Sequence, residues 1–106
     1  MRHQMLAVVL LTLSAPVYSS SHETTLLKNN GCLGCHSLDG SPGSAAIGPA
    51  YPKVAQRYKN DPQALTKLVS KVRNGGYGNW GQMPMPPHPN VPLNDLRAMI
   101  NFILKQ

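Results

Sequence analysis

The chain has few of the residues on which small domains commonly rely for stability. It holds two cysteines in 106 residues, three positions apart, so one disulfide between them would close a loop too short to stabilise much. Aromatic residues make up 6% of the sequence, which suits a core completed by a bound group. Acidic residues are also scarce: the chain has four of them and ten lysines and arginines, so the formal net charge is +6.

Long hydrophobic runs are missing as well, apart from one near the N-terminus. The run Met5–Leu13 follows the basic residue Arg2, and it is too short to cross a membrane as a helix. A basic start, a short apolar run and small residues after it are typical of a secretory signal peptide. We predict a signal peptide over residues 1–19, with an approximate cleavage point, and a single domain over residues 20–106. A retained N-terminal anchor is the alternative.

The remaining domain is small and basic. Removal of residues 1–19 takes away Arg2 alone, so the net charge becomes +5 (10 − 1 − 4). A domain of this size buries a modest share of its surface and often needs an additional stabilising feature, such as a disulfide, a metal or a bound cofactor. The positive charge favours acidic protein partners. Nucleic acid is not a predicted partner, because no recognised binding motif is present and the protein is predicted to be exported.

The run CLGCH at Cys32–His36 is the most informative part of the chain. Two thiols separated by two residues and followed by a histidine form the signature of covalent haem attachment. Each thiol can add to one haem vinyl group, and the histidine then lies beneath the iron. A disulfide and a metal–thiolate site are the alternatives. Zinc would need further ligands from His22 or His88, at spacings that match no familiar zinc motif.

Helical periodicity and end signals predict an all-α fold. Ser21 or Thr24 can cap the first helix and Gly31 ends it, while Asp61 and Pro62 mark the start of the third. No segment has the pattern of a strand, and glycine- and proline-rich loops separate the helices. The predicted helices span about 21–30, 52–59, 62–74 and 93–105, with loops at 37–52 and 74–92.

An iron held by His36 needs a ligand on its other face, and the loop 74–92 holds the candidates. A methionine thioether suits a haem that only changes its oxidation state. Prolines stand on both sides of Met85 and restrict its backbone, so Met85 is the predicted ligand. Met83, His88 and an open iron remain as alternatives.

Three motifs, in order, resemble the haem-binding landmarks of the class I cytochromes c, in particular the short bacterial monohaem type often called cytochrome c-551 or c-552. They are GCLGCH at 31–36, IGPAY at 47–51 and NWGQMPMPP at 79–87. The resemblance covers about residues 21–106. It implies four to five short helices wrapped around one covalently attached haem c.

The same resemblance implies a role for individual residues. Pro49 matches a proline whose carbonyl accepts a hydrogen bond from the proximal histidine, and Trp80 matches a tryptophan that packs near the haem and donates to a propionate. His88 stands where related proteins often carry asparagine, and we expect it to be an exposed loop side chain. No catalytic residue is expected. The implied cofactor-binding residues are Cys32, Cys35, His36, Pro49, Trp80 and Met85, with His36 and Met85 as iron ligands.

These features predict a periplasmic electron carrier, not an enzyme, because an iron with two protein ligands is closed to substrate. Its partners would be redox proteins with acidic docking surfaces, approached near the attachment loop by lysines such as Lys28 and Lys53. After signal cleavage no membrane anchor is expected. The runner-up is a haem c subunit of an oxidoreductase complex, such as a molybdenum-dependent sulfite dehydrogenase. An open-site haem enzyme or gas sensor and a structural module without haem are the remaining alternatives.

Overall fold

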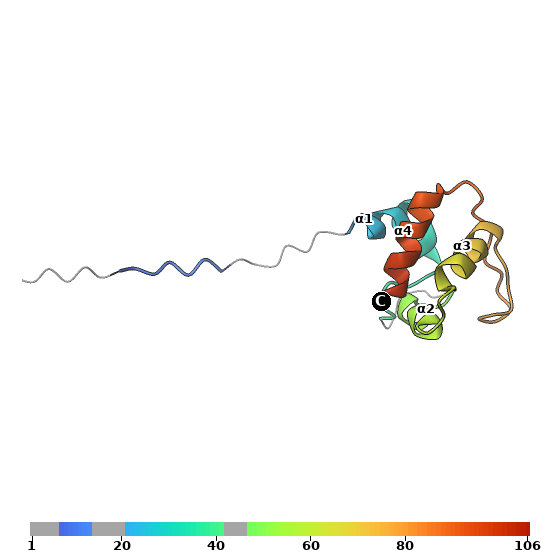
Figure 1. Cartoon of the computed structure of the whole chain (residues 1–106), viewed down its shortest axis with the longest axis horizontal. Coiled ribbons are helices and arrows are strands. Elements are labelled where there is room, and N and C mark those ends of the chain that lie inside the picture. The colour runs from blue at the N-terminus through green and yellow to red at the C-terminus, as the bar shows by residue number, and fades with distance from the viewer. Residues whose placement is uncertain (1–6, 14–20, 42–46) are drawn as a thin grey trace, which may run out of the picture.

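The computed structural model describes residues 7–13, 21–41 and 47–106 of the chain. Residues 7–13 form neither helix nor strand, and the apolar side chains from Val8 to Leu13 that can be described are exposed. This segment extends away from the helical part (Figure 1). Within the described ranges, no helix has the length and apolar character needed to cross a membrane. The predicted cleavage point lies outside the described residues, so the signal peptide and the domain boundary stay predictions.

The first helix, α1 (His22–Asn29), delivers the chain to the attachment motif. Ser21 caps it: the hydroxyl oxygen of Ser21 accepts the Thr24 N–H at 3.1 Å. After the helix, Gly31 takes the left-handed conformation with φ 74°, which a residue with a side chain rarely adopts. The chain then enters a short 3₁₀ turn, η1 (Cys32–Gly34), which carries the first cysteine.

The middle helices are α2 (Tyr51–Tyr58) and α3 (Ala64–Asn74). The predicted start of α3 at Asp61 and Pro62 is wrong, since the helix begins at Ala64. The Asp61 carboxylate instead accepts the Gln63 N–H at 2.9 Å, and the Ala64 N–H reaches the Asp61 carbonyl at 3.1 Å. These bonds close a tight turn before regular α-helical bonding starts.

The last helix, α4 (Leu93–Leu104), carries the core. Its residues Leu96, Met99, Ile100 and Ile103 recur at spacings of three and four and are all buried. The helix packs against α1, α2 and α3, as Figure 1 shows. Leu27 of α1 belongs to the same buried cluster.

The described residues contain no strand, and four α-helices with one 3₁₀ turn carry the fold. One isolated bridge joins Gly76 to Met85 in the long loop after α3. The predicted all-α class with four to five short helices is therefore confirmed.

Candidate haem-binding site

One pocket lies between the helices and the long loop after α3. Its volume is about 160 Å³, many times the roughly 10–15 Å³ that one water needs. Most of its lining is apolar, with side chains from α2, α3 and α4. The chain therefore leaves space in its interior that its own side chains do not fill. The pocket brings together all six predicted cofactor-binding residues: Cys32, Cys35, His36, Pro49, Trp80 and Met85.

The attachment motif forms one side of this pocket. The Cys35 and His36 N–H groups both donate to the Cys32 carbonyl, at 3.2 and 3.0 Å, so the turn holds the three residues close together. The Gly48 N–H donates to the Cys35 carbonyl at 2.7 Å and ties the motif to the next segment. Both cysteines are free thiols, half-buried. The disulfide alternative is therefore absent from this structure.

The described residues around the two cysteines do not form a metal-binding group. Burial, reinforced by the nearby Cys35, raises the pKa of the Cys32 thiol despite a lowering backbone hydrogen bond. The thiolate form of Cys32 is therefore disfavoured in the metal-free protein. Across the described parts of the chain, no group of three or more histidine, cysteine or acidic residues gathers to hold a metal ion. A zinc site therefore lacks a donor set there.

Three neighbours hold the His36 ring in place. Its Nδ1 lies 2.7 Å from the Pro49 carbonyl oxygen; with the proton on Nδ1 the ring donates this bond, and Nε2 keeps its lone pair for a metal. The Tyr51 ring stacks on the imidazole, with centroids 5.1 Å apart and planes 13° from parallel. On another side, a Cβ added to Gly48 would lie 2.6 Å from His36 Cε1. The ring therefore has little freedom to turn.

The phenol of Tyr51, which stacks on His36, is buried and uncharged. Burial, with smaller contributions from Cys32 and Cys35, raises the pKa of its phenol. Tyr51 therefore stays neutral beside the histidine, as a phenol does at physiological pH, and its burial further disfavours the phenolate.

The two methionines of the long loop differ in how they are held. Met85 is partly buried, and its backbone makes two hydrogen bonds with Gly76: the Met85 N–H donates at 2.7 Å, and the Met85 carbonyl accepts at 3.1 Å. Met83 also lines the pocket, but it is 65% exposed. The bridge to Gly76 therefore holds the Met85 backbone, and the Met85 side chain is the less exposed of the two.

His88 does not line the pocket. Its backbone N–H donates to the Val72 carbonyl at 2.9 Å, and its Nδ1 is buried without a hydrogen-bond partner among the described residues. The prediction that His88 is an exposed loop side chain is wrong, because the loop packs back on α3 at this point. Arg73 reinforces that contact through two donated bonds, to the Pro89 carbonyl at 2.8 Å and the Val91 carbonyl at 2.6 Å.

Trp80 stands at the mouth of the pocket, 42% exposed. The Arg57 guanidinium lies over its ring, 4.4 Å from the centroid. Lys71 of α3 also lines the pocket. Sequence reasoning missed Arg57, and no local pattern could have revealed it, because its partner is 23 positions away.

The residues present fit a covalently attached haem. Two free thiols and a histidine with an available Nε2 stand on one wall, a thioether stands in the same pocket, and the lining is apolar. Fold and site together define a haem protein of the electron-transfer class.

Comparison with known proteins gives the family. Residues 24–106 match the family model described as cytochrome c. The chain is 44% identical over 86 residues to cytochrome c-551 of Allochromatium vinosum, covering 81% of this chain and 87% of that protein. It is 37% identical over 82 residues to cytochrome c-552 of Nitrosomonas europaea, covering 77% and 76%. The crystal structure of wild-type Nitrosomonas europaea cytochrome c552 superposes with a TM-score of 0.68, covering 76% of this chain and 95% of that one.

The chain belongs to the cytochrome c family, as a class I monohaem c-type cytochrome. It carries one covalently attached haem c and serves electron transfer between redox proteins rather than catalysis. The predicted family, cofactor and non-enzymatic role are thereby confirmed.

Proposed function

We propose that this cytochrome carries single electrons in the periplasm, with haem c bonded to Cys32 and Cys35 and its iron held between His36 Nε2 and Met85 Sδ. The observation that carries the proposal is the gathering of both thiols, the histidine and Met85 in one apolar pocket. The haem iron, when bound, supplies the redox chemistry by alternating between its ferrous and ferric states.

The residues of the chain set the conditions for that chemistry. Pro49 holds the proton of His36 on Nδ1, which orients Nε2 and raises its basicity as a ligand. The Met85 backbone, pinned to Gly76, keeps the sulfur in the pocket and closes the second face to substrates. The apolar lining excludes water and disfavours additional positive charge, which favours a high reduction potential.

At the pocket mouth, two polar groups are suited to the haem propionates. The Trp80 indole N–H is a donor without an acceptor function, and the Lys71 ammonium is a cation; both residues line the pocket. We assign the propionate hydrogen bond to Trp80, and charge neutralisation to Lys71.

Substitution of the two loop methionines tests the ligand. Met85→Ala should still carry covalent haem but become high-spin and bind carbon monoxide readily in the ferrous state. Met83→Ala, the matched control in the same loop, should keep a low-spin spectrum that carbon monoxide leaves unchanged. The reverse pattern would transfer the ligand to Met83 and overturn the assignment.

The partner surface is proposed to be basic. Lys28 is exposed on α1, four positions before Cys32, and Lys53 is exposed on α2. Residues 20–106 carry a net charge of +5. A double substitution of both lysines by glutamate should slow the oxidation of the ferrous protein by the anion ferricyanide several-fold at low salt. The difference should shrink at 1 M salt, where the Debye length is about 3 Å.

A double substitution of Lys59 and Lys105 by glutamate changes the net charge equally and serves as the control. Equal slowing in both pairs would remove the special role of Lys28 and Lys53. Co-elution of the chain with a larger subunit at high salt would instead place it in an oxidoreductase complex such as a sulfite dehydrogenase.

A further inference from the structure

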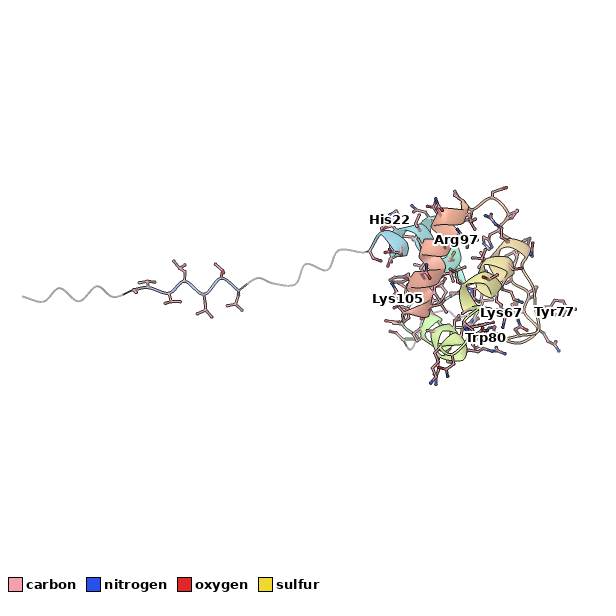
Figure 2. All side chains as sticks on the ribbon, viewed as in Figure 1. His22, Lys67, Tyr77, Trp80, Arg97 and Lys105 are labelled. Carbon is pink, nitrogen blue, oxygen red and sulfur yellow. The ribbon has the colours of Figure 1, made fainter. Side chains whose placement is uncertain are left out.

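The segment Gly76–Gly81 covers the mouth of the pocket but contributes little to its own stability. Gly78 and Gly81 have φ of 95° and 124°, a region that glycine enters at the cost of a large entropy loss on folding. Its large side chains are not anchored by burial: Tyr77 is 77% exposed and projects outward from the segment in Figure 2. Inside the segment, the Gly78 N–H donates to the Gly81 carbonyl at 2.8 Å.

Arg57 connects this segment to α2 by two contacts of different kinds. Its Nη1 donates a hydrogen bond to the Asn79 carbonyl at 2.7 Å. The same guanidinium lies over the neighbouring Trp80, with Cζ 4.4 Å from the ring centroid, a cation–π contact. One side chain therefore holds both the backbone and the aromatic ring of the segment.

The helix that carries Arg57, α2, also contacts His36. Tyr51, in the first turn of α2, stacks on His36, and Arg57 stands in the last turn. The first residue of the segment held by Arg57, Gly76, forms a backbone bridge with Met85. Arg57 thus joins α2, which contacts the proposed iron ligand His36, to the loop that carries the other proposed ligand, Met85.

We propose that Arg57 is a positioning residue that clamps the Gly76–Gly81 segment over the haem and sets the orientation of the Trp80 indole. The proposal rests on the haem site proposed above and deepens it. A planar guanidinium can stack on a ring and donate in its own plane at the same time, whereas a lysine ammonium lacks this geometry. The clamp therefore requires arginine and not just a positive charge.

Native-state hydrogen exchange on the ferrous holoprotein, followed by NMR, tests the clamp. Arg57→Gln should accelerate exchange of the Gly78 amide by about tenfold, the factor expected from loss of one hydrogen bond to a charged group. The Trp80 indole N–H resonance should shift as well. Exchange of the Ile100 amide in the core of α4 should stay unchanged, because opening of the segment is local.

Two further variants separate the clamp from its alternatives. Arg97→Gln removes an exposed arginine of α4 and should change neither the Gly78 amide nor the indole resonance. Arg57→Lys should accelerate Gly78 exchange, although less than Arg57→Gln. Full protection in Arg57→Lys would show that charge alone acts, and unchanged exchange in Arg57→Gln would show that no clamp exists; either result overturns the proposal.

These readouts do not depend on which sulfur binds the iron. A failed ligand assignment would appear in the spectra of the Met85 and Met83 variants, with Gly78 exchange still responding to Arg57. A failed clamp would leave those spectra as expected and Gly78 exchange unaltered.

Discussion

Gly48 occupies a position where a single methyl group should disturb the haem site. Its own φ is not in the left-handed region, so alanine meets no backbone strain there. A Cβ would, however, lie 2.6 Å from His36 Cε1 and 3.0 Å from both ring nitrogens. Ordinary contact begins at 3.4 Å, so the ring or the backbone must retreat by about 0.8 Å (3.4 − 2.6).

A retreat of that size exceeds what the neighbours of the ring can absorb. The His36–Pro49 hydrogen bond measures 2.7 Å, and it can lengthen to about 3.2 Å before its geometry becomes poor. Tyr51 stacks on the ring and limits movement away from Gly48. We expect Gly48→Ala to cost about 1–3 kcal/mol of unfolding free energy, the usual range for overpacking. The ferric spectrum should also change, because the proposed iron ligand is displaced.

Gly34→Ala is the matched control within the attachment motif. A Cβ at Gly34 meets no heavy atom within 4 Å, and its φ is not positive. This substitution should leave the spectrum unchanged and the free energy of unfolding equal or higher by about 0.4–1 kcal/mol. Denaturant unfolding and optical spectra of both purified holoproteins measure the difference. A Gly48→Ala protein as stable as the parent, with the same spectrum, would refute the close packing around His36.

Two further predictions concern the core and the surface. Leu96 is 1% exposed, so Leu96→Ala should lower the free energy of unfolding by about 2–5 kcal/mol. Leu93 is 41% exposed, and Leu93→Ala should change it by no more than about 0.5 kcal/mol. Similar losses for both variants in urea unfolding would contradict the assigned core. The Lys67 ammonium, 2.6 Å from the Asp61 carboxylate, and the Gln63 N–H lower the pKa of Asp61. A lowered pKa in the folded state contributes stability above the ordinary value of about 3.9 that is lost as the pH falls through the folded pKa. Asp61→Asn and Lys67→Gln should each flatten the fall in urea midpoint between pH 5 and pH 2, and an unchanged fall in both would exclude the contribution.

The helices were largely predictable because their signals are local. The cap at Ser21, the glycine after α1 and the three–four spacing of Leu96, Met99 and Ile100 depend on residues within a turn or two of one another. The start of α3 was missed for a local reason as well. The Asp61 side chain can cap a helix or close a turn, and the chain uses it for the turn.

The finer contacts of the site depend on residues distant in sequence and could not be predicted from it. Gly48 and Tyr51 meet His36 across 12 and 15 positions, and no periodicity records such a contact. The clamp by Arg57 and the packing of His88 against α3 arise only when the loop folds back. The haem-binding motifs could be predicted from the sequence, whereas the distant residues that orient their side chains could not.

The optical spectrum of the protein exported with haem-maturation machinery tests the proposed ligation most directly. It should be recorded in the oxidised and reduced states, with and without carbon monoxide. Histidine–methionine ligation predicts sharp low-spin bands, the weak far-red band of a sulfur-ligated ferric haem and no response to carbon monoxide. A high-spin spectrum, or prompt binding of carbon monoxide, would show an open iron and contradict a closed electron carrier.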